Sequence, residues 1–326
     1  MNNILITGVS GQDGLFLTSE LLKNNKKLNI YGQTRSKNST HFFNKLRTLY
    51  KGDCNNVTLV NIDLENINDI KNFITDKKPN AIFNLAGPSS VYNSLIDGGD
   101  TYKKITLIFD NLIKSITEIP EYSPKFFQAS SSEIFQKNNN GTFNELSKYE
   151  STTPYAKAKL ENHLKSSEIR SKYGIDIYSG IMFNHESEFR NNDYLIMKII
   201  NSARSIKEKK TDSVELGSLN YIRDWSFAGD MAKAIYKITY YGSKDFYVIG
   251  SGKGHSIKDM VETIFSYFGL EWREHVKENK NLLRAGGLQK IVADNELIKR
   301  DLKWSPELSF QEMIIRCIER QYKIKD

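Results

Sequence analysis

Tyr155 and Lys159 stand four residues apart in a segment whose apolar pattern predicts a helix over residues 151–173. This spacing places both side chains on one face of the helix. A tyrosine ordinarily titrates near ~10, which is too high for a base at neutral pH. A neighbouring ammonium favours the phenolate, so we expect Lys159 to lower the pKa of Tyr155. Because Tyr-x-x-x-Lys also occurs by chance on helix surfaces, the catalytic interpretation depends on the elements that accompany it.

A hydroxyl and a carboxylate lie upstream of this pair. Ser131 and Glu133 follow a strand predicted around Phe126-Phe127. Open α/β sheets place their chemistry at the ends of such strands, where these two side chains can face one pocket. A glutamate in a loop is otherwise most often solvated, so the catalytic role of Glu133 also depends on its surroundings.

A glycine-rich segment near the N-terminus predicts a dinucleotide site. Residues 6–14 read Ile-Thr-Gly-Val-Ser-Gly-Gln-Asp-Gly and lie between a predicted strand and a predicted helix. Glycines spaced three apart let the backbone approach a pyrophosphate, whose charge a helix N-terminus stabilises. In this position the loop is a strong signal, and its spacing is that of short-chain dehydrogenases. The expected cofactor contacts are Gly8, Ser10, Gly11, Gln12, Asp13 and Gly14.

The end of the second predicted strand favours NADP as the cofactor. An NAD site usually carries Asp or Glu there, whereas arginine accommodates a 2′-phosphate. Residues 31–37 contain Arg35 and no carboxylate, and no acidic residue occurs between Glu20 and Asp53. This basic stretch is also compatible with an oligomer contact. Further cofactor contacts are expected after the third and fourth strands, at Asp63, Leu64, Leu85 and Ala86.

Alternating strands and helices predict the fold. Buried strands are expected at residues 4–6, 28–31, 57–62, 81–85, 126–127, 175–181 and 247–249, with helices between them. This order indicates an α/β fold with a Rossmann-type doubly wound parallel sheet and a smaller C-terminal α/β substrate domain. We expect the first domain to span residues 1–183 and about 220–250. The second then spans 184–219 and 251–326.

Composition narrows the class of protein. The 326 residues are 39% hydrophobic and 26% charged, as in a soluble globular protein. No apolar run reaches the ~18 residues of a membrane span, and no secretory leader is expected, so we expect a cytoplasmic protein. The two cysteines, Cys54 and Cys317, have no metal-ligand spacing, and no metal site is expected. The net charge of +7 is diffuse and accompanies no nucleic-acid reader motif.

The chain resembles the extended short-chain dehydrogenases/reductases, and specifically the GDP-mannose 4,6-dehydratase family, over nearly its full length. The resemblance depends on five segments: Gly8–Gly14, Gln128–Glu133, Pro154–Lys159, Phe183–Ser187 and Arg223–Trp225. It implies conversion of a GDP-hexose to its GDP-4-keto-6-deoxy product, with internal hydride transfer from C4 to C6 through NADP. A homodimer or homotetramer is also implied.

The resemblance also implies roles for individual residues. Tyr155 and Lys159 match the oxidation pair, Ser131 the hydroxyl position, usually Thr in the family, and Glu133 the acid/base position. The matching substrate contacts are Ser89, Asn184, Lys198, Arg223 and Arg284, and His185 is expected to be structural, with Trp225 in the core.

Departures from the family pattern cluster at the expected sugar contacts. Pro88 and Ser90 replace the family's Gln and His, residues 188–191 read Glu-Phe-Arg-Asn, and residues 285–287 read Ala-Gly-Gly. GDP-N-acetylglucosamine and GDP-manno-heptose therefore remain alternative substrates. A C4 dehydrogenase or epimerase that performs no dehydration is an alternative reaction. A non-enzymatic NADP-binding regulator is a third hypothesis. The Tyr155–Lys159 pair argues against it, because a regulator would have no need for this pair.

Overall fold

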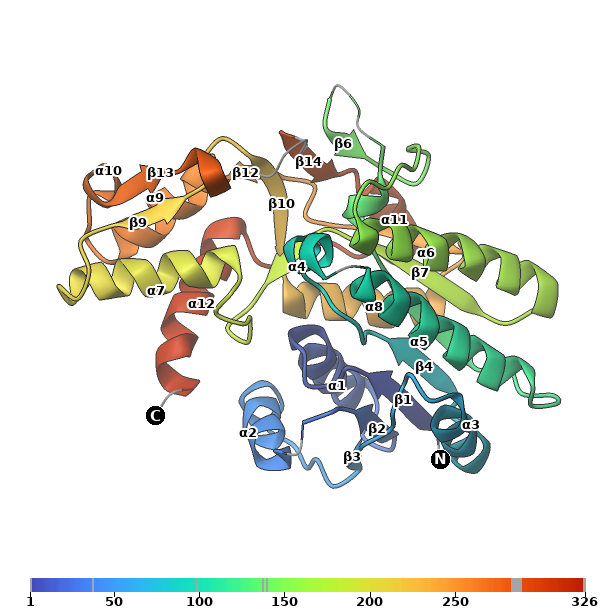
Figure 1. The fold of residues 1–326 in the computed structure, drawn as a ribbon. Coiled ribbons are helices and arrows are strands. Elements are labelled where there is room, and N and C mark those ends of the chain that lie inside the picture. Colours follow the sequence, from blue (N-terminus) through green and yellow to red (C-terminus); the bar gives the residue numbers. More distant parts are fainter. Residues whose placement is uncertain are drawn as a thin grey trace.

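The computed structural model describes residues 2–36, 38–97, 99–136, 138, 140–282 and 289–324. Within these residues, seven parallel strands form one large sheet in the order β11-β7-β5-β4-β1-β2-β3 (Figure 1). The strand order runs outward in both directions from β1 and β4, which confirms the predicted doubly wound fold. The strands are β1 (Asn3–Thr7), β2 (Asn29–Gln33), β3 (Val57–Val60), β4 (Ala81–Asn84), β5 (Lys125–Ser131), β7 (Ile177–Met182) and β11 (Phe246–Ile249).

Helices cover both faces of the large sheet. Ile4 and Ile6 of β1 join one apolar core and Leu5 joins the other, because successive side chains of a strand point to opposite faces. The first face carries α1 (Gln12–Asn24), α2 (Ser39–Leu49), α8 (Ala228–Tyr241) and α11 (Glu296–Leu302); the second carries α3 (Ile67–Lys77), α5 (Asp100–Thr117) and α6 (Pro154–Tyr173). The short α4 (Val91–Ile96) lies beside α5 and α6.

Helix α6 begins three residues later than its predicted start. Thr153 is the N-cap, and its Oγ1 accepts a hydrogen bond from the Ala156 N–H at 3.1 Å. Pro154 occupies the first turn, where its missing N–H costs nothing. Gly174 ends the helix with φ 65, a left-handed conformation that glycine adopts without strain. These local signals set the register of the helix that carries Tyr155 and Lys159.

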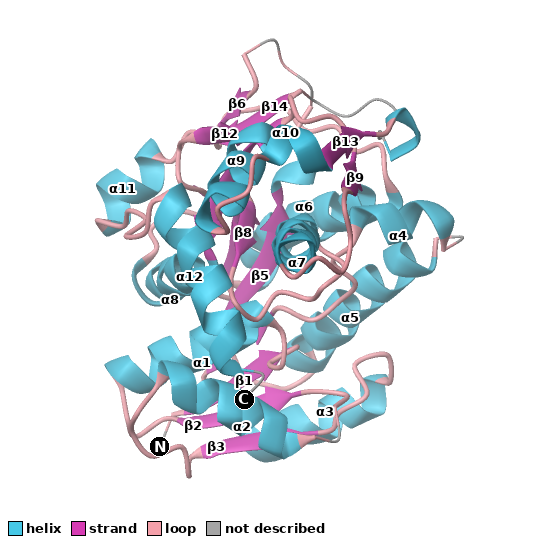
Figure 2. Ribbon diagram, turned by 90° about the vertical axis from the view of Figure 1, so that its left-hand side faces the viewer, coloured by secondary structure: helices cyan, strands magenta, loops and turns pink. Residues whose placement is uncertain are grey.

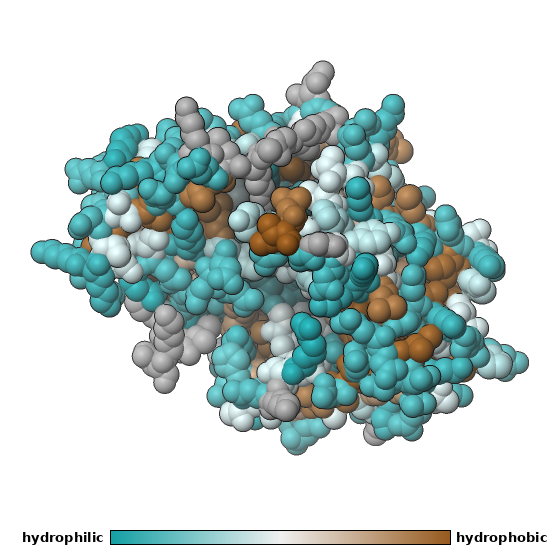
Figure 3. All heavy atoms as spheres, in the orientation of Figure 1, coloured by the Kyte–Doolittle hydropathy of each residue, from teal (hydrophilic) through white to brown (hydrophobic). Residues whose placement is uncertain are grey.

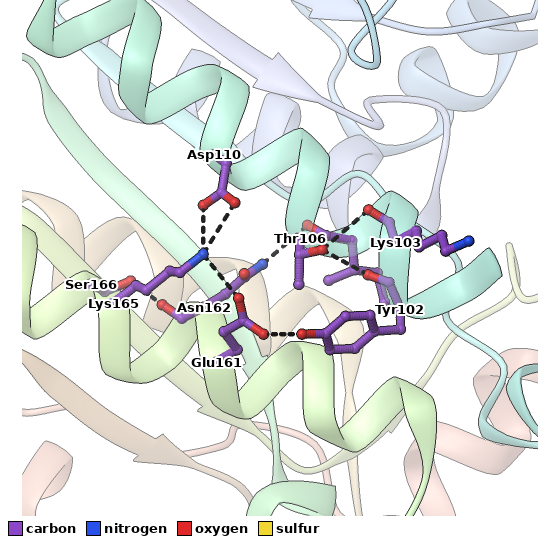
Figure 4. A network of polar contacts seen from close by, with 9 residues as sticks. Tyr102, Lys103, Thr106, Asp110, Glu161, Asn162, Lys165 and Ser166 are labelled. Carbon is purple, nitrogen blue, oxygen red and sulfur yellow. Dashed lines mark hydrogen bonds and ion pairs between the residues drawn. The ribbon is translucent and has the colours of Figure 1, made fainter. Parts of the chain in front are cut away.

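A network of polar side chains joins α6 to α5 (Figure 4). Lys165 Nζ lies 2.9 Å from both Asp110 Oδ1 and Glu161 Oε1. The Tyr102 hydroxyl donates to Glu161, and Asn162 donates to the carbonyl of Ile105 at 3.1 Å. These contacts lie along the middle of α6 and hold it against its neighbour, so they fix the position of the helix.

The C-terminal unit is built on a second sheet with the order β12-β10-β14-β6, in which β8 also pairs with β10. Its strands are β6 (Thr142–Phe143), β8 (Asn184–Glu186), β10 (Ile222–Phe227), β12 (Gly254–Ser256) and β14 (Lys290–Ala293). A separate pair is β9 (Val214–Leu216) with β13 (Val276–Glu278). The helices here are α7 (Leu195–Lys207), α9 (Ile257–Tyr267), α10 (Trp272–His275) and α12 (Phe310–Ile324), and the short 3₁₀ turns are η1 (Ser132–Ile134) and η2 (Lys280–Leu282).

Strand β10 lies in this second sheet, although the predicted domain limits placed residues 220–250 in the first domain. The chain leaves the second sheet at Phe227 and enters α8, which packs against α1. Trp225 is buried and packs against Phe310, as expected of a core residue. Figure 2 shows the two parts one above the other, with β1, β2 and β3 in the lower part and β6, β12 and β14 in the upper. Across the described ranges, the helices are too short or too polar to cross a membrane.

Candidate active site

A cavity of about 870 Å³ lies where the loops after β1, β2, β3 and β4 meet. This is the point where the strand order reverses, and open α/β sheets bind their ligands there. The structure brings most predicted cofactor residues to its wall, namely Gly8, Ser10, Gly11, Gln12, Asp13, Gly14, Arg35, Asp63, Leu64, Leu85 and Ala86, together with Ser89.

The glycine-rich loop has the geometry of a nucleotide cradle. Gly8 has φ +68, and a Cβ there would lie 2.9 Å from the Cα of Ala86. A Cβ on Gly14 would lie 2.5 Å from the Val9 backbone. Gly11 is the N-cap of α1 and supplies no side-chain cap, so the first N–H groups of the helix are left for a ligand. The residues present therefore fit the diphosphate of a dinucleotide.

The end of β2 carries an amide and a cation in place of a carboxylate. The Gly8 N–H donates to Gln33 Oε1 at 3.0 Å, and Gln33 Nε2 donates to the Ile62 carbonyl at 3.0 Å. Both ends of the Gln33 side-chain amide are therefore hydrogen-bonded within the protein. Arg35, two residues further on, is exposed at the cavity wall. Lys45 and Lys104 line the same cavity, so three cations surround the region.

Tyr155 and Lys159 are both buried on one face of α6. Lys159 Nζ donates to the Ala129 carbonyl at 2.9 Å and lies 5.7 Å from the centroid of the Tyr155 ring. Burial lowers the pKa of Lys159 to about 8, against the opposing charge of Asp13. The lysine is therefore close to titrating at neutral pH.

The expected lowering of the Tyr155 pKa does not occur in this structure. Burial raises the pKa of Tyr155 to about 12, which outweighs the opposing effects of the Ser131 hydroxyl and the Arg190 charge. The negative charge of Glu133 acts in the same direction as burial. The four-residue spacing of Tyr155 and Lys159 indicates their proximity, but it does not show that Tyr155 is buried and that its phenolate is therefore disfavoured.

Ser131 and Glu133 flank the Tyr155 hydroxyl from the end of β5. Ser131 is the last residue of that strand, and its Oγ accepts the Glu133 N–H at 3.3 Å. Both groups influence the pKa of Tyr155, Ser131 through a side-chain hydrogen bond and Glu133 through its charge. The structure thus places Ser131, Glu133, Tyr155 and Lys159 together.

Predicted substrate contacts in the C-terminal unit do not line this cavity. Asn184 is exposed in β8, and Lys198 on α7 donates to the Glu215 carbonyl at 2.7 Å. Arg223 in β10 donates to the Ile222 carbonyl at 2.8 Å and lies over the Tyr221 ring. Arg284 lies outside the described residues.

Sequence reasoning missed Arg190 and Tyr194, which line the cavity from the segment between β8 and α7. The Arg190 guanidinium carbon lies 3.6 Å from the centroid of the Tyr194 ring, and Arg190 Nε lies 3.0 Å from Glu186 Oε2. Residues 188–191 depart from the family pattern, and this departure drew attention to the segment. It did not indicate that Arg190 lines the cavity or contacts Tyr194 and Glu186. The parts of the chain that the structure describes hold no cluster of metal-ligating side chains.

Comparison with known proteins identifies the family of the chain. A family model described as GDP-mannose 4,6 dehydratase matches residues 5–317. GDP-mannose 4,6 dehydratase 2 of Arabidopsis thaliana is 28% identical over 327 residues, which span 98% of this chain and 87% of that protein. GDP-mannose 4,6 dehydratase of Homo sapiens is 28% identical over 353 residues, with 99% and 92% covered.

Solved structures share the fold at lower identity. A dTDP-glucose 4,6-dehydratase from Bacillus anthracis in complex with NAD superposes with a TM-score of 0.82 at 19% identity, covering 99% of this chain and 97% of the other. RMD from Pseudomonas aeruginosa complexed with NADPH has a TM-score of 0.79 at 16% identity, with 99% and 100% covered. The fold is that of an extended short-chain dehydrogenase/reductase, and the chain belongs to the GDP-mannose 4,6-dehydratase family.

Proposed function

We propose that this protein is a nucleotide-sugar 4,6-dehydratase that converts a GDP-hexose, GDP-mannose or a close relative, to its GDP-4-keto-6-deoxy product. The observation that carries the proposal is the grouping of Ser131, Glu133, Tyr155 and Lys159, whose side chains act on one another beside a nucleotide-sized cavity. The family relationship and the names of the relatives support the same reaction.

The four residues divide the proton transfers of this reaction. Tyr155 removes the proton of the C4 hydroxyl, and Ser131 holds the same oxygen in line through a hydrogen bond. For this role the pKa of Tyr155 has to fall from about 12, and the Lys159 ammonium, 5.7 Å from the centroid of its ring, is the charge that we propose lowers it. Oxidation at C4 acidifies the proton at C5, which Glu133 removes, and Glu133 then protonates the departing C6 hydroxyl. A nicotinamide cofactor held by the glycine-rich loop would supply the hydride acceptor for C4 and the hydride donor for C6.

NADP is the cofactor that we propose. Arg35, Lys45 and Lys104 line the cavity, and Arg35 stands where an NAD site usually carries a carboxylate. A nicotinamide cofactor is also present in the Bacillus anthracis and Pseudomonas aeruginosa structures. Tyr155 and Lys159 would contact its nicotinamide ribose.

The C-terminal unit is proposed to bind the GDP end of the substrate. Asn184, Lys198, Arg223 and Arg284 are the residues proposed to hold its diphosphate and base end. For this role Lys198 has to exchange its present contact with the Glu215 carbonyl for a phosphate oxygen. Ser89 is proposed to contact the sugar. We propose a cytoplasmic homodimer or homotetramer, which light scattering of the pure protein would test.

The test is mass spectrometry of GDP-mannose, GDP-N-acetylglucosamine and GDP-manno-heptose, each incubated with pure protein and NADP⁺ in deuterated water. A product lighter by one water, with deuterium at C5, supports the dehydratase and identifies the sugar. A product lighter by two hydrogens, formed with an equivalent of reduced cofactor, would instead support a C4 dehydrogenase. A product of unchanged mass that chromatography separates from the substrate would support a C4 epimerase.

A further inference from the structure

A hydrogen bond spans the cavity between its two walls. The Tyr194 hydroxyl and Ser89 Oγ lie 2.7 Å apart, and both residues line the cavity. Ser89 belongs to the loop that leads from β4 to α4, whereas Tyr194 directly precedes α7. Figure 1 shows α4 and the start of α7 facing one another near the centre of the molecule. The space-filling view in the same orientation shows a hollow near the centre of this face (Figure 3).

Arg190 holds the Tyr194 ring in place. Its guanidinium lies over the ring at 3.6 Å, closer than the 5.7 Å between Lys159 Nζ and the Tyr155 ring. The other side of the arginine contacts Glu186, whose side chain is only 6% exposed. Separating a buried carboxylate from a cationic neighbour is costly, so Glu186 anchors Arg190 although His185 also acts on that carboxylate. Tyr194 is therefore presented from a rigid base, and only its hydroxyl has an exchangeable partner.

The hydrogen bond lies beside the reacting hydroxyl and remains open to solvent. Tyr194 and Arg190 both act electrostatically on the hydroxyl of Tyr155, so the three side chains share one region. The bond between Tyr194 and Ser89 is itself exposed, with Ser89 exposed and Tyr194 half-buried. A ligand hydroxyl can replace an exposed hydroxyl–hydroxyl bond at little net cost, because the number of hydrogen bonds is conserved.

We propose that Tyr194 is a specificity-determining residue whose phenol hydroxyl exchanges Ser89 for a hydroxyl group of the hexose. This inference rests on the proposed function, since it identifies a sugar contact in the same site. Ser89 and Tyr194 then bind the sugar from opposite walls of the cavity, while the contact with Arg190 holds the Tyr194 ring in place. Sugars that lack the matching hydroxyl, or carry a bulkier group there, bind more weakly.

The test distinguishes binding of the hexose from binding of the GDP part of the substrate. Tyr194→Phe retains the ring and its contact with Arg190 and removes only the hydroxyl, so it conserves volume and the fold. We measure KM and kcat for GDP-mannose, the inhibition constant of GDP, and the Kd of NADP⁺. The matched control is Tyr267→Phe, which removes the hydroxyl of a 45% exposed tyrosine on α9.

Loss of one hydrogen bond to the sugar predicts that KM for GDP-mannose rises about 5- to 20-fold in Tyr194→Phe. The inhibition constant of GDP and the Kd of NADP⁺ stay within about twofold of wild type, because neither ligand carries the hexose. Ser89→Ala also raises KM, and the double variant shows whether both hydroxyls act on the same sugar. Tyr267→Phe matches wild type in every measurement.

Three other outcomes overturn the inference in distinguishable ways. Equal weakening of GDP and GDP-mannose in Tyr194→Phe assigns the hydroxyl to the shape of the cavity rather than to the sugar. An unchanged KM means that the sugar does not contact it. A wild-type protein that converts no GDP-hexose contradicts the proposed function itself, and this inference falls with it.

Discussion

Oδ1 of Asp13 lies 3.0 Å from Nε2 of His185, although the first belongs to the glycine-rich loop and helix α1 and the second to strand β8. Gln12 forms the same kind of link, because its Nε2 donates to the His185 carbonyl at 3.0 Å and its Oε1 accepts the Ser187 hydroxyl at 2.8 Å. Gly8–Gly14 and Phe183–Ser187, two of the segments on which the family resemblance depends, therefore bind one another. Gln12 and Asp13 of the glycine-rich loop help to position the segment that carries Arg190.

The Asp13–His185 contact predicts a pH-dependent contribution to stability. Burial alone disfavours the imidazolium, but the Asp13 carboxylate outweighs it and raises the pKa of His185 above its usual 6.5. A histidine whose pKa is raised on folding stabilises the protein fully below the unfolded pKa, and this contribution disappears as pH rises through the folded pKa. Replacement by His185→Gln should therefore cost more free energy of unfolding at pH ~6 than at pH ~9.

Urea unfolding of wild type and His185→Gln across that range measures this difference. Asp13 stays ionised throughout, because its own pKa is lowered by His185 against the effect of burial. His41→Gln is the control, since this histidine is exposed on α2. A wild-type-to-variant difference that is constant with pH would show that the contact is maintained by the neutral imidazole.

Glu133→Gln should separate the two halves of the proposed reaction. The glutamine cannot take the C5 proton, whereas the Tyr155–Lys159 pair that oxidises C4 is unchanged. Loss of general base help reduces turnover by about 10²- to 10⁴-fold. The absorbance of reduced nicotinamide should therefore accumulate on the enzyme after GDP-mannose is mixed with it, without release of a dehydrated product. Normal turnover in this variant would remove Glu133 from the mechanism.

Arg35→Glu should exchange the preferred cofactor. The arginine is exposed at the cavity wall beyond the end of β2, and a glutamate there repels a 2′-phosphate but can accept a hydrogen bond from a 2′-hydroxyl. The Kd of NADP⁺ should rise at least about tenfold, while the Kd of NAD⁺ stays the same or falls. Lys51→Glu makes the same change of charge at an exposed residue that does not line the cavity. An equal loss of NADP⁺ affinity in both variants would indicate a general effect of charge.

Sequence predicted those features of the fold that depend on neighbouring residues. The Tyr155–Lys159 spacing is one turn of a helix, and the Thr153 cap and Gly174 stop lie at its ends, so residue types alone indicate α6. The glycine loop is equally local. The strand expected at residues 57–62 ends at Val60, within the usual uncertainty of an element boundary.

Features that depend on contacts between distant segments were not predictable. Strand β10 pairs with β8, β12 and β14, which come from three other parts of the chain, and nothing in residues 222–227 specifies that sheet. The position of Arg190 depends on its contacts with Glu186 and Tyr194, and it acts electrostatically on Tyr155, which is distant in the sequence. The pKa of Tyr155 follows from burial, which spacing does not report.

Arg316 on α12 should be a strong determinant of stability, because it neutralises a carboxylate with no exposed surface. Its Nε and Nη2 lie 3.2 and 2.9 Å from the two oxygens of Glu188, whose side chain is 0% exposed. Arg320 lies 3.4 Å from the same carboxylate. Glu188 is between Ser187 and the cavity residue Phe189, so the C-terminal helix is tied to the wall of the cavity.

Removal of one partner of a buried ion pair leaves an uncompensated charge, at a cost of about 3–5 kcal/mol for a fully buried pair. Because Arg316 is 22% exposed and Arg320 remains, we expect Arg316→Met to lose about 3 kcal/mol in urea unfolding. The double variant Arg316→Met with Glu188→Gln should recover part of that loss, since the amide carries no charge. Lys299→Met, which breaks an exposed pair with Glu296, should change stability by less than about 1 kcal/mol. If Arg316→Met has an equally small effect, Arg320 alone compensates the buried charge.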